Sequence, residues 1–267
     1  MTVDLSGVPQ TLFLPLHRRA RWTKVGNPIL EDPFAVELVT RARYDFAGLD
    51  ASFRPTRDLA WVARPWQFDR RVRRFQAQHP KGVVVNLGAG LDTSFSRLDD
   101  GRLRWFDLDL PEVIEIRRSL IPETERSRCI ARSLFDPSWM AEIGDPEDGV
   151  CLLSAGCLFY FTEADLRPFF AAVHQRLPGA ELVFDAVTPM GLDAANKMME
   201  EAGVGGARLK WALKDPQELE RWGVGISQVQ RIPLFSAAPR TGLPLKARWF
   251  MFLMDLTRAS AVIRCRA

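Results

Sequence analysis

Several features that mark other classes of protein are missing from this chain of 267 residues. It has no run of eighteen apolar residues, so we expect neither a spanning segment nor a membrane partner. Residues 1–26 lack the apolar core of a signal peptide. The formal net charge of +3 is too small to indicate a nucleic-acid partner.

Cysteine and histidine are also scarce. The four cysteines lack the paired spacing of a zinc site, so we expect no metal, free thiols and a cytoplasmic location; they are Cys129, Cys151, Cys157 and Cys265. Of the three histidines, only His17 lies in a segment that we expect near a binding site. A clear general base is therefore hard to find.

The most informative stretch is a strand–turn–helix pattern at residues 83–93. A β-branched run leads into Gly88-Ala89-Gly90, and a helical pattern follows. About twenty residues later, a second apolar strand ends in the acids Asp107 and Asp109. Glycines let a backbone approach a ligand closely, and an acid at the next strand end can bind ribose hydroxyls. The spacing predicts half of a nucleotide-binding site, and an ordinary strand-to-helix turn is the alternative.

The same turn distinguishes between two cofactors. A dinucleotide site has the pattern Gly-x-Gly-x-x-Gly, with a pyrophosphate over the helix N-terminus. Here Thr93 stands at the third glycine, and the charge of Asp92 would repel a pyrophosphate. S-adenosylmethionine has no phosphate and tolerates that acid, so the residues favour this cofactor. We expect Asp92 to cap the following helix or to accept hydrogen bonds from the turn amides.

A longer set of motifs carries a family resemblance. Five motifs, in order over about residues 10–190, resemble those of the leucine carboxyl methyltransferase family, whose bacterial branch includes tetracenomycin-type polyketide O-methyltransferases. They lie at residues 28–35, 86–93, 106–114, 132–139 and 156–161. An ordered set of this kind is more specific than any one motif.

The resemblance and the alternation of strand and helix patterns agree on an α/β fold. We expect a class I S-adenosylmethionine methyltransferase, Rossmann-like, with a mostly parallel seven-stranded sheet and an antiparallel last strand. We assign residues 1–75 to an N-terminal helical cap and residues 76–267 to the cofactor-binding core, with a helical lid near 190–225. The apolar runs at 248–257 and 261–265 are interpreted as an antiparallel pair of strands that closes the sheet edge.

The remaining strands and helices follow from apolar periodicity and capping residues. Predicted strands cover residues 83–87, 103–108, 129–134, 150–155 and 182–187. Predicted helices cover residues 91–98, 111–120, 162–177, 192–202 and 216–222, and Thr162 is the expected N-cap of the third.

Specific residues inherit roles from the resemblance. Gly88, Ala89 and Gly90 are expected against the methionine and ribose of the cofactor. Asp109 matches the ribose-binding acid, and Asp107 is the alternative, because alternate residues of a strand face opposite ways.

Other cofactor contacts are implied further along the chain. Arg64 is expected to bind the carboxylate of S-adenosylmethionine, for which a guanidinium is suited, although a surface arginine is the alternative. Ser133 and Leu134 match an adenine-contacting pair, although a strand end and turn explain them equally well. Where the family has an acid, this chain has Ala155. Because of that departure, a protein that binds the cofactor without catalysing a reaction remains the alternative.

The acceptor is constrained only in part. Tyr160 ends the fourth-strand motif and is our candidate catalytic residue, with a structural tyrosine as the alternative. A carboxylate is already ionised and needs no base, whereas a phenol or alcohol benefits from one. The lack of a clear base favours a carboxylate or an acidic phenol as the acceptor group. The resemblance to tetracenomycin-type enzymes implies that this group belongs to a small natural product-like molecule. A protein C-terminus is the alternative that the family name implies, and the oligomeric state stays open.

Overall fold

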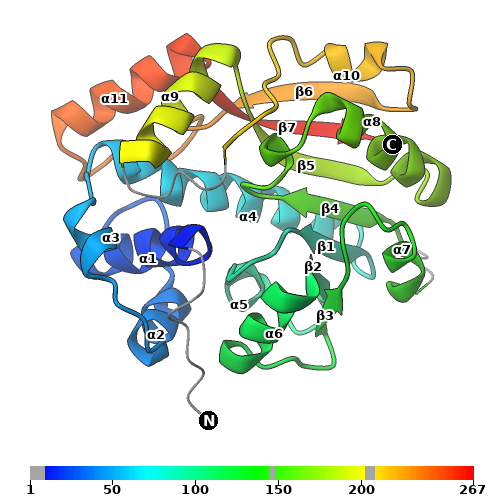
Figure 1. The fold of residues 1–267 in the computed structure, drawn as a ribbon, viewed down its shortest axis with the longest axis horizontal. Coiled ribbons are helices and arrows are strands. Elements are labelled where there is room, and N and C mark those ends of the chain that lie inside the picture. The colour runs from blue at the N-terminus through cyan, green and yellow to red at the C-terminus, as the bar shows by residue number, and fades with distance from the viewer. Residues whose placement is uncertain (1–9, 145–147, 202–207) are drawn as a thin grey trace.

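The chain is described by a computed structural model that covers residues 10–144, 148–201 and 208–267. Its strands are β1 (Val83–Leu87), β2 (Arg104–Asp109), β3 (Ser127–Ala131), β4 (Val150–Ser154), β5 (Glu181–Val187), β6 (Ser227–Pro233) and β7 (Ser260–Arg266). They form one sheet in the order β3-β2-β1-β4-β5-β7-β6 (Figure 1).

The sheet is parallel from β3 through β5, and β7 runs antiparallel to both β5 and β6. The expected fold class is therefore confirmed. The carboxyl ends of five parallel strands meet at one edge, which is where ligands bind in such sheets. The residues of β1, β4 and β5 are all buried, because helices cover both faces of the sheet.

Helices cover the sheet and also form a separate group beside it. Those before β1 are α1 (Gln10–Val25), α2 (Pro33–Arg41), α3 (Ala47–Ala51), the 3₁₀ turn η1 (Arg57–Leu59) and α4 (Ala60–Gln78). Those up to β5 are α5 (Ser94–Leu98), α6 (Pro111–Leu120), α7 (Trp139–Glu142), the 3₁₀ turn η2 (Leu158–Tyr160) and α8 (Glu163–Arg176). Those after β5 are α9 (Pro189–Glu201), α10 (Glu218–Arg221) and α11 (Leu245–Thr257).

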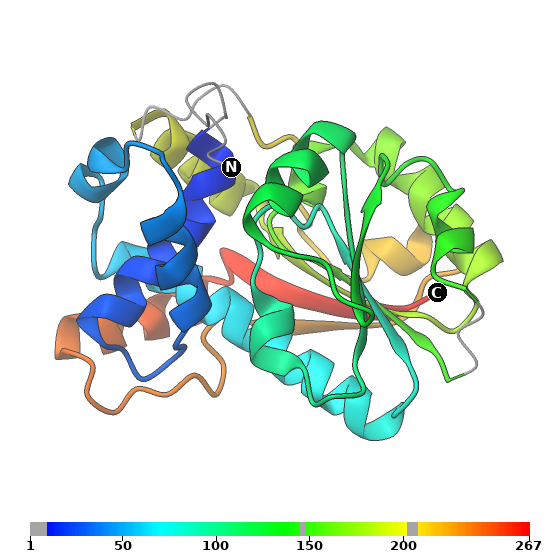
Figure 2. The same cartoon turned by 90° about the horizontal axis from the view of Figure 1, so that it is seen from below.

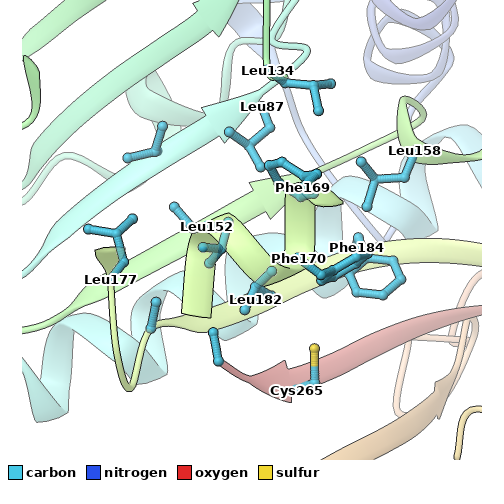
Figure 3. Close-up of a cluster of buried hydrophobic side chains, with 14 of the residues drawn as sticks. Leu87, Leu134, Leu152, Leu158, Phe169, Phe170, Leu177, Leu182, Phe184 and Cys265 are labelled. Carbon is cyan, nitrogen blue, oxygen red and sulfur yellow. The ribbon is translucent and has the colours of Figure 1, made fainter. Parts of the chain in front are cut away.

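The alternation of side chains along β1 divides the core between the two faces of the sheet. Val83, Val85 and Leu87 belong to a cluster with α7 and α8, part of which Figure 3 shows around Leu87, Phe170 and Phe184. Val84 points the other way, into a cluster with α4 and α11. One short valine-rich strand thus contacts both helical layers.

The helices α1, α2 and α3 lie to one side of the sheet in both views (Figures 1 and 2). A third cluster, which includes Phe13, Leu38 and Leu49, holds them together. The helix α4 contacts β4 and β5, and the proposed boundary at residue 75 falls inside it. Residues 1–9 of the predicted cap and 202–207 of the predicted lid lie outside the described residues, so the division into cap, core and lid stays a prediction.

Several helix ends confirm the chemistry expected from the sequence. Thr162 is the N-cap of α8, where its side chain and that of Asp165 form a reciprocal capping box. Pro111 occupies the first turn of α6, whose bounds match the prediction. Two other elements differ from the prediction: α5 is shorter, since it begins only at Ser94, and β3 lies earlier in the chain, since it covers Ser127–Ala131 and not residues 129–134.

The prediction of a strand at residues 248–257 is wrong, because this run lies in α11. The helix is apolar on two sides. Ala247 and Met251 are buried against the sheet, whereas Trp249, Phe252 and Leu253 are exposed. Apolar residues all round a helix remove the 3.6-residue period that identifies it in a sequence.

The partner of β7 is instead β6, which the sequence did not reveal. This strand lies at the sheet edge, and most of its residues are exposed or half-buried. An edge strand with few apolar residues carries little periodic signal. Within the described residues, no helix has the length and apolar character needed to cross a membrane.

Candidate cofactor-binding site

A cavity of about 520 Å³ opens at the carboxyl ends of β1, β2 and β4. The turn after β1 forms its floor, and α1, α4 and α6 contribute its walls. Its lining includes Leu12, Leu14, Trp61, Arg64, Gly88, Ala89, Gly90, Asp109, Val113, Gly156, Phe159, Tyr160 and Met199. Six of the predicted site residues are thus brought together in one cavity: Arg64, Gly88, Ala89, Gly90, Asp109 and Tyr160.

Hydrogen bonds lock the turn after β1 to the end of β2. The amides of Gly88 and Ala89 donate to the carbonyl of Leu108, at 2.8 and 3.1 Å. The amide of Gly90 donates to Asp109 at 2.7 Å, and that of Leu110 to the same carboxylate at 2.8 Å. Burial raises the pKa of Asp109, although these amide hydrogen bonds oppose the shift. Each carboxylate oxygen keeps acceptor capacity for a ligand.

The structure separates the two candidate acids at the end of β2. Asp107 faces away from the cavity and forms a buried ion pair with Arg117 at 2.6 Å. It also accepts hydrogen bonds from Trp105 Nε1 and Asn86 Nδ2 at 2.9 and 3.1 Å. Asp109 alone of the two lines the cavity.

Gly88 is required by both conformation and space. Its φ of +66° lies in the left-handed region, and a Cβ there would be 2.5 Å from the Sγ of Cys157. Burial raises the pKa of Cys157 to about 12, so this thiol is protonated at neutral pH. A side chain at residue 88 would narrow the floor of the cavity, and this bare turn fits the close approach of an adenosyl cofactor.

Asp92 occupies the helix N-terminus where a dinucleotide would place its pyrophosphate. Its carboxylate accepts a hydrogen bond from the amide of Ser94 at 3.1 Å, as expected of an acid that binds the turn amides. Burial alone would raise the pKa of Asp92, but Arg19 and Arg97 outweigh it and lower the pKa. A buried negative charge therefore lies where a phosphate would need to lie.

A second buried acid joins the N-terminal helices to this turn. Asp32 caps α2 by accepting from the amide of Ala35 at 3.0 Å. It also forms ion pairs with Arg19 at 2.9 Å and Arg97 at 2.7 Å, and accepts from Thr93 Oγ1 at 2.5 Å. The helices α1 and α2 are thus tied to the first motif by charge as well as by apolar packing.

Arg64 reaches the cavity from α4. Its Nη1 pairs with Asp185 at 3.0 Å, and its guanidinium lies 5.0 Å from the ring centre of Trp61. Within the described residues, its other N–H groups have no hydrogen-bond partner. Such a side chain can bind a carboxylate in the cavity.

Sequence reasoning missed Asp185, which also accepts from the amide of Gly156 at 2.7 Å. The signal that would have identified it is an acid inside the apolar run at residues 182–187 of β5. It also supplies an acid beside the turn in which Ala155 replaces the acid of the family motif.

Not every predicted residue lies at the cavity. Ser133 and Leu134 are absent from its lining. The Leu134 side chain packs in the core, and the Ser133 hydroxyl accepts from the amide of Phe135. Their adenine contact stays a prediction. His17 is also absent, since it is buried against Phe46 and pairs with Asp50 at 3.1 Å.

Tyr160 is positioned by η2, directly after β4, and it lines the cavity. Burial raises the pKa of Tyr160, although Arg64 opposes the shift, so its hydroxyl is protonated at neutral pH. No histidine lines the cavity among residues 10–144, 148–201 and 208–267. In the same residues, no group of three or more His, Cys, Asp or Glu side chains is arranged to hold a metal ion.

Comparison with known proteins places this geometry in context. A sequence model of the leucine carboxyl methyltransferase family matches residues 14–174. The chain is 34% identical to the tetracenomycin polyketide synthesis O-methyltransferase TcmP of Streptomyces glaucescens, with 82% of this chain and 80% of that protein covered. It is 27% identical to the S-adenosyl-L-methionine-dependent methyltransferase dpfgK of Gibberella zeae, with 90% and 87% covered.

The fold also matches solved structures of low sequence identity. A candidate methyltransferase from Thermobifida fusca has a TM-score of 0.60 at 16% identity, with 90% of this chain and 95% of that chain covered. A DUF574-family protein from Streptomyces avermitilis has a TM-score of 0.57 at 13% identity, with 94% and 96% covered. These two likenesses concern the fold alone.

Proposed function

The chain belongs to the leucine carboxyl methyltransferase family and is an S-adenosylmethionine-dependent O-methyltransferase, and from this premise we propose that its acceptor is a small, largely apolar molecule with a carboxylate or phenolic oxygen. One observation carries the proposal. The cavity combines an apolar wall with a protonated tyrosine, and no histidine lines it within the described residues. Such a site suits an acceptor that is already ionised.

The residues of the cavity divide among the parts of the cofactor. We propose that Asp109 binds the ribose hydroxyls and that Arg64 binds the cofactor carboxylate. The backbone of Gly88, Ala89 and Gly90 is the part of the turn that the cofactor approaches closely. Ser133 and Leu134, in the turn after β3, are proposed to contact the adenine.

When bound, S-adenosylmethionine would supply an electrophilic methyl group, whose bond to sulfur would break as the acceptor oxygen bonds to the methyl carbon, with S-adenosylhomocysteine as the leaving group. The residues of the chain position the acceptor oxygen against the methyl group and exclude water from the cavity. Apolar side chains of α1 and α6, such as Leu12, Leu14 and Val113, exclude water from one wall. The hydroxyl of Tyr160 is protonated and can donate a hydrogen bond that orients the acceptor oxygen.

The class of acceptor has two supports. Trp61, Phe159 and Met199 add to the apolar wall, which suits a flat or lipid-like molecule. The relative from Streptomyces glaucescens acts in tetracenomycin polyketide synthesis, so aromatic polyketide acids and phenols are the first acceptors to try.

The four free cysteines support the proposed cytoplasmic location.

A screen of acceptors with mass-spectrometric detection of the methylated product tests the proposal. Carboxylic acids and phenols of low pKa should be methylated, and aliphatic alcohols of similar size should not. Tyr160→Phe should lower kcat about tenfold, as expected for loss of one positioned hydrogen bond. Tyr44→Phe is the control, because Tyr44 stacks on Phe13 outside the cavity. Methylation of alcohols alone would contradict the proposal, and cofactor binding without turnover of any acceptor would favour a non-catalytic binding protein.

A further inference from the structure

Asp185 is a buried acid that does not line the cavity itself but binds two residues that do. Its side chain is 6% exposed, and that of Arg64 is 16% exposed. One carboxylate oxygen accepts from Arg64 Nη1 at 3.0 Å, and the other from the amide of Gly156 at 2.7 Å. Both partners line the cavity. The acid therefore holds together two parts of the cavity wall that come from distant segments of the chain.

Steric contacts as well as charge fix the position of the Arg64 guanidinium in the cavity wall. Gly156 has a φ of +80°, and a Cβ at this residue would lie 2.9 Å from Arg64 Nη1. The stacking of Arg64 on Trp61 fixes its other side. Three segments thus enclose one arginine: α4, the turn after β4, and β5.

The stability of the sheet gives no reason for an acid at this position. The neighbours of Asp185 in β5 are apolar and buried, and a buried charge is costly even when it is paired. An apolar residue would extend the core at lower cost. An ion pair beside a cavity is better explained by what the cavity binds.

We propose that Asp185 is the positioning residue for the amino-acid end of S-adenosylmethionine, acting by holding the Arg64 guanidinium in the cavity wall. This inference rests on the proposed assignment of Arg64 to the cofactor carboxylate. Asp185 accepts a hydrogen bond from Nη1 of Arg64, and this contact sets the orientation of the whole guanidinium, including its remaining N–H groups. A long side chain fixed in this way loses less freedom when it binds its ligand.

The charges of the pair also match those of the ligand. The amino-acid end of the cofactor is a zwitterion, with a carboxylate and an ammonium group. An isolated Arg64 would complement only the carboxylate. Asp185 lies behind Arg64 in the wall, so a negative charge lies next to the positive one at this end of the cavity, and the zwitterion meets a balanced pair of charges.

Two adenosyl ligands test the inference, because only one contains the amino-acid part. S-adenosylhomocysteine carries it, whereas 5′-methylthioadenosine has the same adenosyl thioether without it. Isothermal calorimetry should show that Asp185→Asn weakens S-adenosylhomocysteine binding about tenfold, as expected for the loss of an ion pair that orients a charged hydrogen bond. Binding of 5′-methylthioadenosine should be unchanged.

Glu181→Gln is the matched control. Glu181 begins the same strand, is buried and pairs with Arg264, but it does not line the cavity. This variant should bind both ligands as the wild type does. If Asp185→Asn does not fold, Asp185→Glu serves the same test, since it keeps the charge but displaces it by one methylene. It should again lose affinity for S-adenosylhomocysteine only, by a smaller factor.

A double-mutant cycle shows whether Asp185 acts through Arg64. In an Arg64→Ala background, Asp185→Asn should change the affinity for S-adenosylhomocysteine less than twofold, because the group that it positions is gone. Equal losses for both ligands would mean a general structural role and would overturn the inference. So would unchanged or tighter binding of S-adenosylhomocysteine by Asp185→Asn. Failure of the wild type to bind either ligand would instead contradict the assignment of the cofactor site.

Discussion

The backbone amide of Gly90 donates a 2.7 Å hydrogen bond to the carboxylate of Asp109. This bond joins the turn after β1 to the end of β2, so the shape of the turn and the position of the acid are set together. Two residues earlier, Asp107 points to the other side of the strand and is engaged by Arg117. One strand thus carries an acid for the cavity and an acid for the core.

This division predicts different defects for the two acids. Asp109→Ala should weaken S-adenosylhomocysteine binding about tenfold to a hundredfold, because charged hydrogen bonds contribute about 1.5–3 kcal/mol. Asp107→Asn should instead lower the free energy of unfolding by about 3–5 kcal/mol, because it leaves Arg117 buried without its partner.

Calorimetry and urea unfolding of both variants check this prediction. NAD is the control ligand, and it should not bind the wild type. A larger loss of ligand affinity in a stably folded Asp107→Asn than in Asp109→Ala would reverse the assignment of the two acids.

Two glycines with positive φ allow the cost of backbone strain to be measured apart from the cost of a steric clash. Gly101→Ala should cost about 1 kcal/mol of stability, since its φ is +84° but its Cβ would meet nothing within 4 Å. Gly88→Ala should cost about 1–3 kcal/mol more, because its Cβ would be 2.5 Å from the Sγ of Cys157. Thermal unfolding of the two variants gives the comparison, and equal costs would mean that Cys157 can move aside freely.

The helix α11 predicts unequal effects for two neighbouring apolar residues. Met251→Ala should cost about 2–5 kcal/mol, because Met251 is completely buried. Trp249→Ala should cost less than about 1 kcal/mol, because that side chain is 63% exposed. In a strand the two residues would share a face and their costs would be similar. Urea unfolding decides between these outcomes.

Asp32 predicts part of the dependence of stability on acid pH. Burial would raise its pKa, but Arg19 and Arg97 outweigh it, so the folded pKa lies below the ordinary value of 3.8. Its contribution is therefore fully present above about pH 4 and is lost as the pH falls through the folded pKa. Asp32→Asn should lower the free energy of unfolding by about 3–5 kcal/mol at neutral pH.

The same variant should show a shallower fall in stability below pH 4 than the wild type does. Unfolding midpoints in urea between pH 2.5 and pH 7 measure both effects. Glu37→Gln is the control, since Glu37 forms an exposed pair with Arg41. Parallel stability curves for the wild type and Asp32→Asn would show that Asp32 does not titrate as its contacts require.

The sequence by itself determined the parts of this protein whose signals are local. The turn at Gly88–Gly90, the acids after it and the N-cap at Thr162 are short patterns with a direct physical meaning. The alternation of strand and helix patterns predicted the parallel sheet, and the turn with its acids predicted the class of cofactor, which the structure and the family comparison confirm. The order of the motifs along the chain was enough for the family.

Tertiary structure decided whatever depends on contacts between distant segments. It determined that the apolar run at residues 248–257 is a helix, which the sequence does not reveal because the exposed side of this helix is as apolar as its buried side. It selected Asp109 over Asp107 for the cavity and brought Asp185 to Arg64 across 121 positions of the chain. A local pattern fixes how a segment bends and which way it alternates, but only packing fixes what each side chain then meets.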